Sequence, residues 1–237
     1  MPKPKLPFKN FKWTPKLAYI VGLLATDGNL SGDGRHIIMC SSDKSLLRTF
    51  RSCLDLKNKI GKTYDRLTKR PSYRIQFGNI QLYNWLISIG VTPAKTYTIG
   101  AIKIPDKFFR DFLRGHLDGD GTIFTYTDRY NSYKGRIYTN QRIYTKFYSV
   151  SKTHVIWLYD KISVLAEVKG ALLCRPPRSY NHVSMWEIKF AKKASIELWK
   201  WIYYKKRLPC LKRKMILAQR LSKLITNEKR RKYTKIS

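Results

Sequence analysis

The feature that most constrains the fold is an order of helical and strand-like segments that occurs twice along the chain. Residues 14–96 begin with a helix that ends near Asp27-Gly28, followed by a strand-like run, a helix, two strands and a further helix. Residues 105–214 repeat this order after a helix that ends at Asp120-Gly121. Recurrence over about 110 residues, even without close sequence identity, indicates two similar structural units. We therefore predict an α+β protein with two pseudo-symmetric αββαββα halves.

Hydrophobic periodicity and turn residues give the expected bounds of these segments. Helices are predicted at 15–27, 43–54, 81–89, 105–120, 152–166, 193–205 and 215–225. Strands are predicted at 36–41, 60–67, 73–77, 169–175 and 183–190, with a long hairpin over 122–150. We expect an N-terminal half of residues 1–100, a C-terminal half of residues 101–225 and a basic tail of residues 226–237.

The charge of the chain predicts a polyanionic partner. Lys and Arg number 48 against 15 Asp and Glu, which gives a formal net charge of +33. A folded chain with this charge repels itself, and nucleic acid is the favoured polyanion to offset the repulsion. The basic residues alternate with Tyr, Phe and Trp along the whole chain, as in an extended nucleic-acid-binding face. An anionic membrane surface is less favoured, because no apolar run approaches the roughly 18 residues of a spanning helix.

The cysteines, the histidines and the N-terminal segment indicate an intracellular protein without a zinc site. No CxxC pair or His–Cys cluster occurs among Cys40, Cys53, Cys174, Cys210, His36, His116, His154 and His182. Reduced thiols in an intracellular protein are the favoured interpretation. Residues 1–13 are basic and lack the apolar core of a signal peptide. We expect the cytoplasm or nucleoid of a microbe, or an organelle, and no membrane partner.

Two nine-residue segments at the ends of the repeated helices carry the most informative residues. They read IVGLLATDG over residues 20–28 and LRGHLDGDG over residues 113–121. Gly22 and Gly115 lie at the same place in the two segments, and they leave room for two helices to pack backbone to backbone. Such packing would bring together Asp27 and Asp120, which precede the last glycine of each segment.

Two neighbouring carboxylates predict a divalent cation. Like charges disfavour each other, and the C-terminal end of a helix is an unfavourable place for an anion. A divalent cation offsets both effects, and Mg²⁺ prefers oxygen ligands, including phosphate oxygens and water. Metal-assisted hydrolysis of a phosphodiester bond follows from this arrangement. One Asp-Gly pair alone would be ordinary turn chemistry, but two at the same place in a repeat favour catalysis.

The two segments resemble the paired LAGLIDADG motifs of a monomeric homing endonuclease, and the resemblance extends from Trp13 to Leu224. It implies a saddle whose two antiparallel sheets lie in the major groove of double-stranded DNA, with the motif helices at the interface of the halves. The implied activity is metal-dependent hydrolysis of both strands at a long asymmetric site. Mg²⁺ is the implied cofactor, with Ca²⁺ or Mn²⁺ as substitutes.

The resemblance also implies roles for individual residues. Asp27 and Asp120 are implied to be catalytic and to bind metal, together with the backbone carbonyls of Thr26 and Gly119. Asp118, two residues before Asp120, falls at a position that is usually structural, and we assign it no metal.

A basic residue near the end of each half completes the implied catalytic site. Lys95 matches this position in the first half, and Lys214 matches it in the second half, where Lys212 is the alternative. A lysine there can order water or stabilise charge on the phosphate. Asp43 and Ser151 occupy a position where the family commonly has glutamine, so their role stays open.

Long polar side chains on the predicted strands are expected to read bases in the major groove. The side chains predicted to bind DNA are Arg66, Arg70, Arg74, Gln76, Arg129, Lys134, Arg136, Arg142, Lys146, Arg175, Arg178 and Lys189.

We expect a free-standing, intron-encoded endonuclease that acts as a monomer without an obligate protein partner. Met1 and the lack of a terminal His-Asn pair argue against a surrounding splicing intein. The alternative is an intron RNA maturase of the same fold with weak or no cleavage, for which intron RNA is the partner. A transcription regulator with this domain is less favoured, because no separate helix-turn-helix segment remains.

Overall fold

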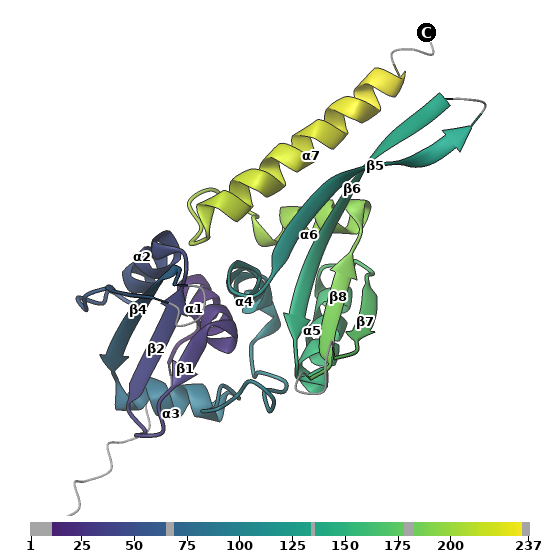
Figure 1. Cartoon of the computed structure of the whole chain (residues 1–237). Helices are drawn as coiled ribbons and strands as arrows, with labels where there is room; N and C mark the ends of the chain where they lie inside the picture. The colour runs from purple at the N-terminus through teal and green to yellow at the C-terminus, as the bar shows by residue number, and fades with distance from the viewer. Residues whose placement is uncertain (1–10, 65–68, 134–135, 178–182, 234–237) are drawn as a thin grey trace, which may run out of the picture.

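The computed structural model describes residues 11–64, 69–133, 136–177 and 183–233, leaving aside the side chains of residues 130–133, 136–138 and 226–233. Two four-stranded antiparallel sheets lie on either side of a central pair of helices (Figure 1). The predicted α+β architecture with two similar halves is confirmed. No helix in the described ranges has the length and apolar character needed to cross a membrane.

The first half starts with α1 (Pro15–Thr26), whose beginning follows from its sequence. The Thr14 side chain accepts a hydrogen bond from the Leu17 N–H at 3.1 Å, and Pro15 opens the helix, where its missing N–H is not needed. The first sheet has the order β1 (Gly28–Leu30), β2 (His36–Ser41), β4 (Pro71–Gly78), β3 (Gly61–Tyr64). Helices α2 (Lys44–Cys53) and α3 (Ile80–Ser88) pack against β2, and α2 also packs against β4.

The second half repeats this topology at larger size. It contains α4 (Asp106–Asp118), β5 (Thr122–Tyr133), β6 (Arg136–Ser149), α5 (Lys152–Leu165), β7 (Ala171–Arg175), β8 (Met185–Phe190) and α6 (Lys192–Ile202). The strand order β5-β6-β8-β7 is the counterpart of β1-β2-β4-β3. A last helix, α7 (Lys212–Tyr233), runs alongside the long β5–β6 hairpin (Figure 1).

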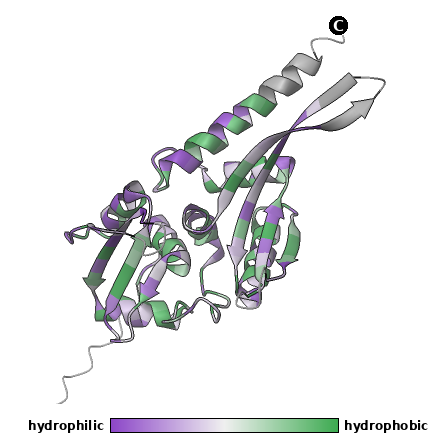
Figure 2. Ribbon diagram, viewed as in Figure 1, coloured by the Kyte–Doolittle hydropathy of each residue, from purple (hydrophilic) through white to green (hydrophobic). Residues whose placement is uncertain are grey.

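Each sheet has one apolar face and one open face, as the alternation of side chains along a strand requires. Ile37 and Met39 of β2 are fully buried on the apolar face of the first sheet, and Phe147 of β6 is fully buried in the second. Figure 2 shows how hydrophobic residues concentrate in α1 and along the strands, whereas the first turn of α7 is hydrophilic. The helices cover the apolar faces, so the residues between those buried ones lie on the open faces.

Several predicted bounds were wrong, among them the end of α6, which lies at Ile202 instead of residue 205. Strand β1 was missed, because its three residues are too short to show an alternating pattern. Helix α4 ends at Asp118 instead of residue 120, because Gly119 leaves the helical conformation with ψ near −100°. Helix α7 starts at Lys212 and continues to Tyr233, beyond the predicted range of 215–225, since its flanking residues are mostly good helix formers.

Candidate functional site

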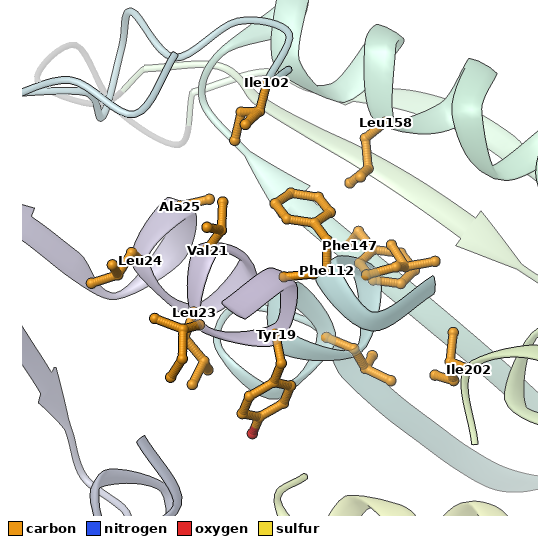
Figure 3. Packing of buried hydrophobic residues seen from close by; sticks show 14 of the residues in the cluster. Tyr19, Val21, Leu23, Leu24, Ala25, Ile102, Phe112, Phe147, Leu158 and Ile202 are labelled. Atoms are coloured by element: carbon orange, nitrogen blue, oxygen red, sulfur yellow. The ribbon is translucent and has the colours of Figure 1, made fainter. Parts of the chain in front are cut away.

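Helices α1 and α4 touch backbone to backbone at two glycines. A Cβ atom added to Gly22 would lie 2.1 Å from the Phe112 carbonyl oxygen, and one added to Gly115 would lie 2.1 Å from the Tyr19 carbonyl oxygen. Both distances are far inside van der Waals contact, so no larger residue fits at either position. Figure 3 shows the apolar side chains around this contact, including Val21 and Phe112.

The close helix contact brings Asp27 and Asp120 into electrostatic reach of each other. Asp27 caps the end of α1, where its N–H donates to the Leu23 carbonyl at 3.0 Å, and Asp120 follows the end of α4. Burial, and then the charge of Asp120, raise the pKa of Asp27 to about 7. Burial also raises the pKa of Asp120, although its side chain is partly open to solvent. Two carboxyl groups that resist ionisation are a site that a cation would stabilise.

Lys95 and Lys214 occupy equivalent places beside these carboxyl groups. The Lys95 ammonium group donates to the carbonyls of Thr26, at 3.3 Å, and Gly28. The Lys214 ammonium group donates to the carbonyl of Gly121 at 2.6 Å and lies 3.4 Å from that of Gly119. Each lysine therefore bonds the carbonyls on either side of the aspartate in its own half.

Both lysines are buried, and this burial affects their protonation. Lys95 is 8% exposed and Lys214 is 7% exposed, whereas Lys212 is open to solvent. Burial lowers the pKa of Lys214 to about 8 and also lowers the pKa of Lys95, although Asp27 and Asp120 oppose the shift in both. Of the two lysines considered in the second half, Lys214 is the one whose position matches Lys95.

The oxygen atoms of the site suit a hard divalent cation. Asp27 and Asp120 contribute carboxylates, and Thr26 and Gly119 contribute backbone carbonyls whose second lone pairs are available. Within the described part of the chain, no group of three or more His, Cys, Asp or Glu residues could hold a metal. A cation here would therefore take its remaining ligands from water and phosphate, as Mg²⁺ commonly does.

Asp118 has a different environment from Asp120. Its carboxylate is buried and accepts hydrogen bonds from the Tyr19 hydroxyl at 2.9 Å and the Leu211 N–H at 2.6 Å. Burial raises the pKa of Asp118 to about 6, although these two donors and Lys214 oppose the shift. Asp118 thus ties α4 to α1 and to the start of α7.

Asp43 and Ser151 make structural contacts at equivalent helix starts. Asp43 caps α2 by accepting from the Ser45 N–H at 2.9 Å, and it also accepts from Arg213 Nε at 3.1 Å. The Ser151 hydroxyl donates to the Ile99 carbonyl at 2.5 Å and fastens the start of α5 to the segment that joins the halves.

A buried histidine pair beside the site was missed by sequence reasoning. His116 Nε2 and His154 Nε2 are 3.1 Å apart, and the two rings are stacked. His154 Nδ1 donates to the Gly100 carbonyl at 2.8 Å, so His154 Nε2 must accept the proton that His116 Nε2 carries. Burial lowers the pKa of both imidazoles and keeps them neutral. The pair lines a cavity of about 400 Å³ that Lys95 and Asp120 also border.

The predicted DNA-binding side chains are placed unevenly over the open faces. Arg66, Lys134 and Arg178 lie outside the described residues, as does the side chain of Arg136. Arg74 and Gln76 lie on the open face of the first sheet, where the Arg74 guanidinium donates to the Gln76 amide oxygen at 2.5 Å. Arg70 is exposed just before β4, and Arg129 is exposed within β5, at the register shift between Asp128 and Asn131. Lys189 lies on the open face of the second sheet.

The other cations of the second sheet are paired with carboxylates. Arg142 Nε donates to Asp128 at 2.9 Å. Glu187 is fully buried between two basic residues, Lys146 at 2.9 Å and Arg175. Their side chains are therefore held in fixed positions on the sheet.

Two sheets of matching strand order, joined through glycine contacts between α1 and α4, define the LAGLIDADG homing-endonuclease fold, and the chain has this fold. One similar structure is the I-LtrWI LAGLIDADG homing endonuclease bound to target DNA, with 14% identity, coverage of 92% of this chain and 91% of that chain, and a TM-score of 0.56. Another is meganuclease I-SmaMI bound to uncleavable DNA, with 12% identity, coverage of 93% and 92%, and a TM-score of 0.59.

The fold is also found in a protein whose name mentions no nuclease. Full-length DUF199/WhiA from Thermatoga maritima matches with 11% identity, covering 94% of this chain and 70% of that chain, at a TM-score of 0.51. No protein-family model and no curated protein matched the sequence. Identities this low establish the fold, so the chemistry has to be argued from the residues.

Proposed function

We propose that the chain is a site-specific endonuclease that hydrolyses both strands of a long, asymmetric double-stranded DNA site. The observation that carries this proposal is the pairing of Asp27 and Asp120, each with a buried lysine bonded to the carbonyls beside it. One carboxylate and one lysine from each half would serve one DNA strand each. We further propose an intracellular, intron-encoded protein that acts as a monomer, since one chain supplies both halves.

Mg²⁺ is the proposed cofactor. The carboxylates of Asp27 and Asp120 and the carbonyls of Thr26 and Gly119 would hold it, with Ca²⁺ or Mn²⁺ as substitutes. A cation bound there would supply an activated water molecule and neutralise charge on the leaving oxygen.

The side chains of the site would position water and phosphate. Burial raises the pKa of both Asp27 and Asp120, so a cation bound beside them would favour their ionised forms. Lys95 and Lys214 lie beside the carboxyl groups, where an ammonium group can orient a water molecule or stabilise a phosphate oxygen. The close glycine contact of α1 and α4 would keep the ends of the two helices, and with them the two aspartates, near each other.

The open faces of the two sheets are the proposed DNA contact, in the major groove. Arg70, Arg74, Gln76, Arg129 and Lys189 offer donors to bases or phosphates, and the net charge of +33 favours the polyanion. Because the two open faces carry different side chains, the two halves of the DNA site should differ in sequence.

Cleavage of a randomised duplex library in Mg²⁺ tests the proposal. We expect Asp27→Asn and Asp120→Asn each to slow cleavage of the recovered site by at least about a hundredfold while DNA binding is retained. Asp160→Asn is the matched control, since it removes an exposed carboxylate from α5 and should cut normally. Absence of any cut duplex, together with tight binding of intron RNA, would instead assign the chain to the maturases.

A further inference from the structure

Three aromatic side chains form a cluster on the open face of the second sheet. The aromatic cluster consists of Phe124 and Tyr126 of β5 and Tyr144 of β6, and the strand register sets Phe124 opposite Tyr144. The ring centroids of Phe124 and Tyr126 are 5.7 Å apart, and those of Tyr126 and Tyr144 are 6.4 Å apart. Phe124 is nevertheless 46% exposed and Tyr126 is 41% exposed. Adjacent apolar side chains left open to water mark a binding surface.

The first sheet offers nothing similar on its open face. The described residues on that face include Asn29, His36, Cys40, Arg74 and Gln76, and none of those described there is Phe, Tyr or Trp. The exposed Tyr64 of β3 lies on the other face of the sheet. The two open faces therefore differ in chemistry, polar in the first half and aromatic in the second.

Polar recognition by the second sheet is restricted, because three of its basic side chains already have carboxylate partners. Arg142 bonds Asp128, while Lys146 and Arg175 bond Glu187. The donors of these three side chains are thus partly engaged before DNA arrives, and beside Lys189 this face presents the apolar surface of the aromatic cluster.

We propose that the aromatic cluster recognises the C5-methyl groups of thymine in the half of the DNA site that the second sheet covers. The inference rests on the proposed binding of duplex DNA in the major groove. There the thymine methyl group is the apolar feature that base pairs present, and apolar side chains distinguish thymine by contact with it. Removing both the methyl group and the ring surface from water would favour the contact.

The geometry of the aromatic cluster favours methyl groups of a duplex over unpaired bases. Stacking of an unpaired base needs an open ring face. The Lys189 ammonium group lies 4.2 Å from the Tyr144 ring centroid, and that of Lys146 lies 5.9 Å from the Phe124 centroid. These ammonium groups lie over one face of Tyr144 and one face of Phe124, which leaves less ring face for stacking, whereas a methyl contact needs only part of a ring.

Replacing thymine by uracil in the DNA tests this inference, because uracil pairs identically and lacks only the methyl group. A duplex site would be selected by binding in Ca²⁺. Its halves would be assigned by a DNA-cleaving reagent attached to Cys174, which is exposed on β7, in a Cys40→Ser variant. We expect uracil in the half under the second sheet to weaken binding about tenfold, and uracil in the other half to change it little.

Protein variants separate the aromatic cluster from a general effect of uracil. In Phe124→Ser and Tyr126→Ser the two duplexes should bind with nearly equal affinity, whereas Tyr64→Ser should keep the preference for thymine. Tyr64 is the matched control, being a 60% exposed aromatic residue on β3 of the first sheet.

The inference and the proposed nuclease activity fail in different ways. Equal binding of thymine and uracil duplexes by the wild-type chain, with cleavage intact, would overturn the inference alone. If the wild-type chain preferred thymine but cut no DNA, the proposed nuclease activity would be contradicted and the inference on thymine recognition would be unaffected. If the serine variants lost affinity for single-stranded oligonucleotides and not for the duplex, the aromatic cluster would be a stacking surface and the inference would be wrong.

Discussion

At the scale of single residues, the site combines carboxyl groups that resist ionisation with lysines that resist protonation. The sequence allowed Asp27, Asp120 and Lys95 to be selected from repeat position and resemblance. It could not separate Lys212 from Lys214, since that choice depends on which ammonium group reaches the carbonyls of Gly119 and Gly121. The pairing of His116 with His154 was not predictable either, because residues 38 positions apart meet only through tertiary packing.

Asp27→Asn should stabilise the chain against unfolding in metal-free buffer at alkaline pH. The folded-state pKa of Asp27 is about 7 against an ordinary value of 3.8, so the folded state binds the proton more tightly than the unfolded state does. The free energy of unfolding of the wild-type chain therefore falls as pH rises from about 4 to about 7. The asparagine variant does not lose this stability, because asparagine does not ionise. We expect a gain of about 2 kcal/mol near pH 8 and little difference near pH 4, measured by urea unfolding.

Divalent cation provides the internal control for this effect. Mg²⁺ that binds the folded wild-type site should stabilise it in proportion to the logarithm of concentration and leave the variant unchanged. An Asp27→Asn variant less stable than wild type at alkaline pH without metal would contradict the account given for the pKa of Asp27.

At the scale of elements, the sequence predicted those segments whose signals are local. The cap at Thr14 and the proline that follows it fixed the start of α1, and a short apolar run fixed β2 at His36–Ser41. Where local signals were weak or misleading, the bounds were wrong. β1 holds only three residues, and the end of α4 was placed at the Asp120-Gly121 pair although Gly119 already turns the chain.

Gly22→Ala should separate α1 from α4 and affect cleavage more than folding. The added Cβ would meet the backbone of Phe112 at 2.1 Å, and backbone atoms cannot move aside as a side chain does. We expect a loss of about 3 kcal/mol in the free energy of unfolding, and a larger relative loss of cleavage because the two carboxylates move apart. Urea unfolding and cleavage rates on the same preparation measure the two effects.

Gly32→Ala is the matched control for this substitution, because nothing lies within 4 Å of a Cβ added there. It should unfold and cleave like the wild-type chain. Normal cleavage by Gly22→Ala would show that the aspartates do not depend on close approach of the two helices.

At the scale of the whole molecule, the net charge and the repeated order of segments could be predicted from the sequence. The chemical difference between the open faces of the two sheets could not. The net charge of +33 and the duplicated segment order need no tertiary information. By contrast, the pairing of Lys146 and Arg175 with buried Glu187 depends on the register of three strands.

DNA binding should weaken steeply as salt concentration rises. Each basic side chain should contribute to binding according to the face of the sheet on which it lies. We expect the logarithm of the association constant to fall linearly with the logarithm of salt concentration. Arg74→Gln, on the open face of the first sheet, should reduce the slope by about one if it contacts a phosphate, or relax sequence preference if it contacts a base. Fluorescence anisotropy over a salt series measures this slope.

Lys200→Gln is the comparison, because Lys200 lies on α6 on the opposite side of the second sheet and is exposed. The Lys200→Gln substitution should leave both the salt dependence of binding and the DNA sequence preference unchanged. Equal effects from the two substitutions would mean that the open faces have no special part in binding.

The contact of α7 with the end of α4 has a consequence for the order in which the chain is made. Leu211 and Lys214 reach back to Asp118 and Gly121, across more than 90 residues of sequence. A ribosome that has completed both aspartates and Lys95 has still to synthesise the segment that brings the second lysine. The nascent protein therefore holds an incomplete site until this segment has been made, and competence to cut DNA would arise only once α7 has emerged and docked.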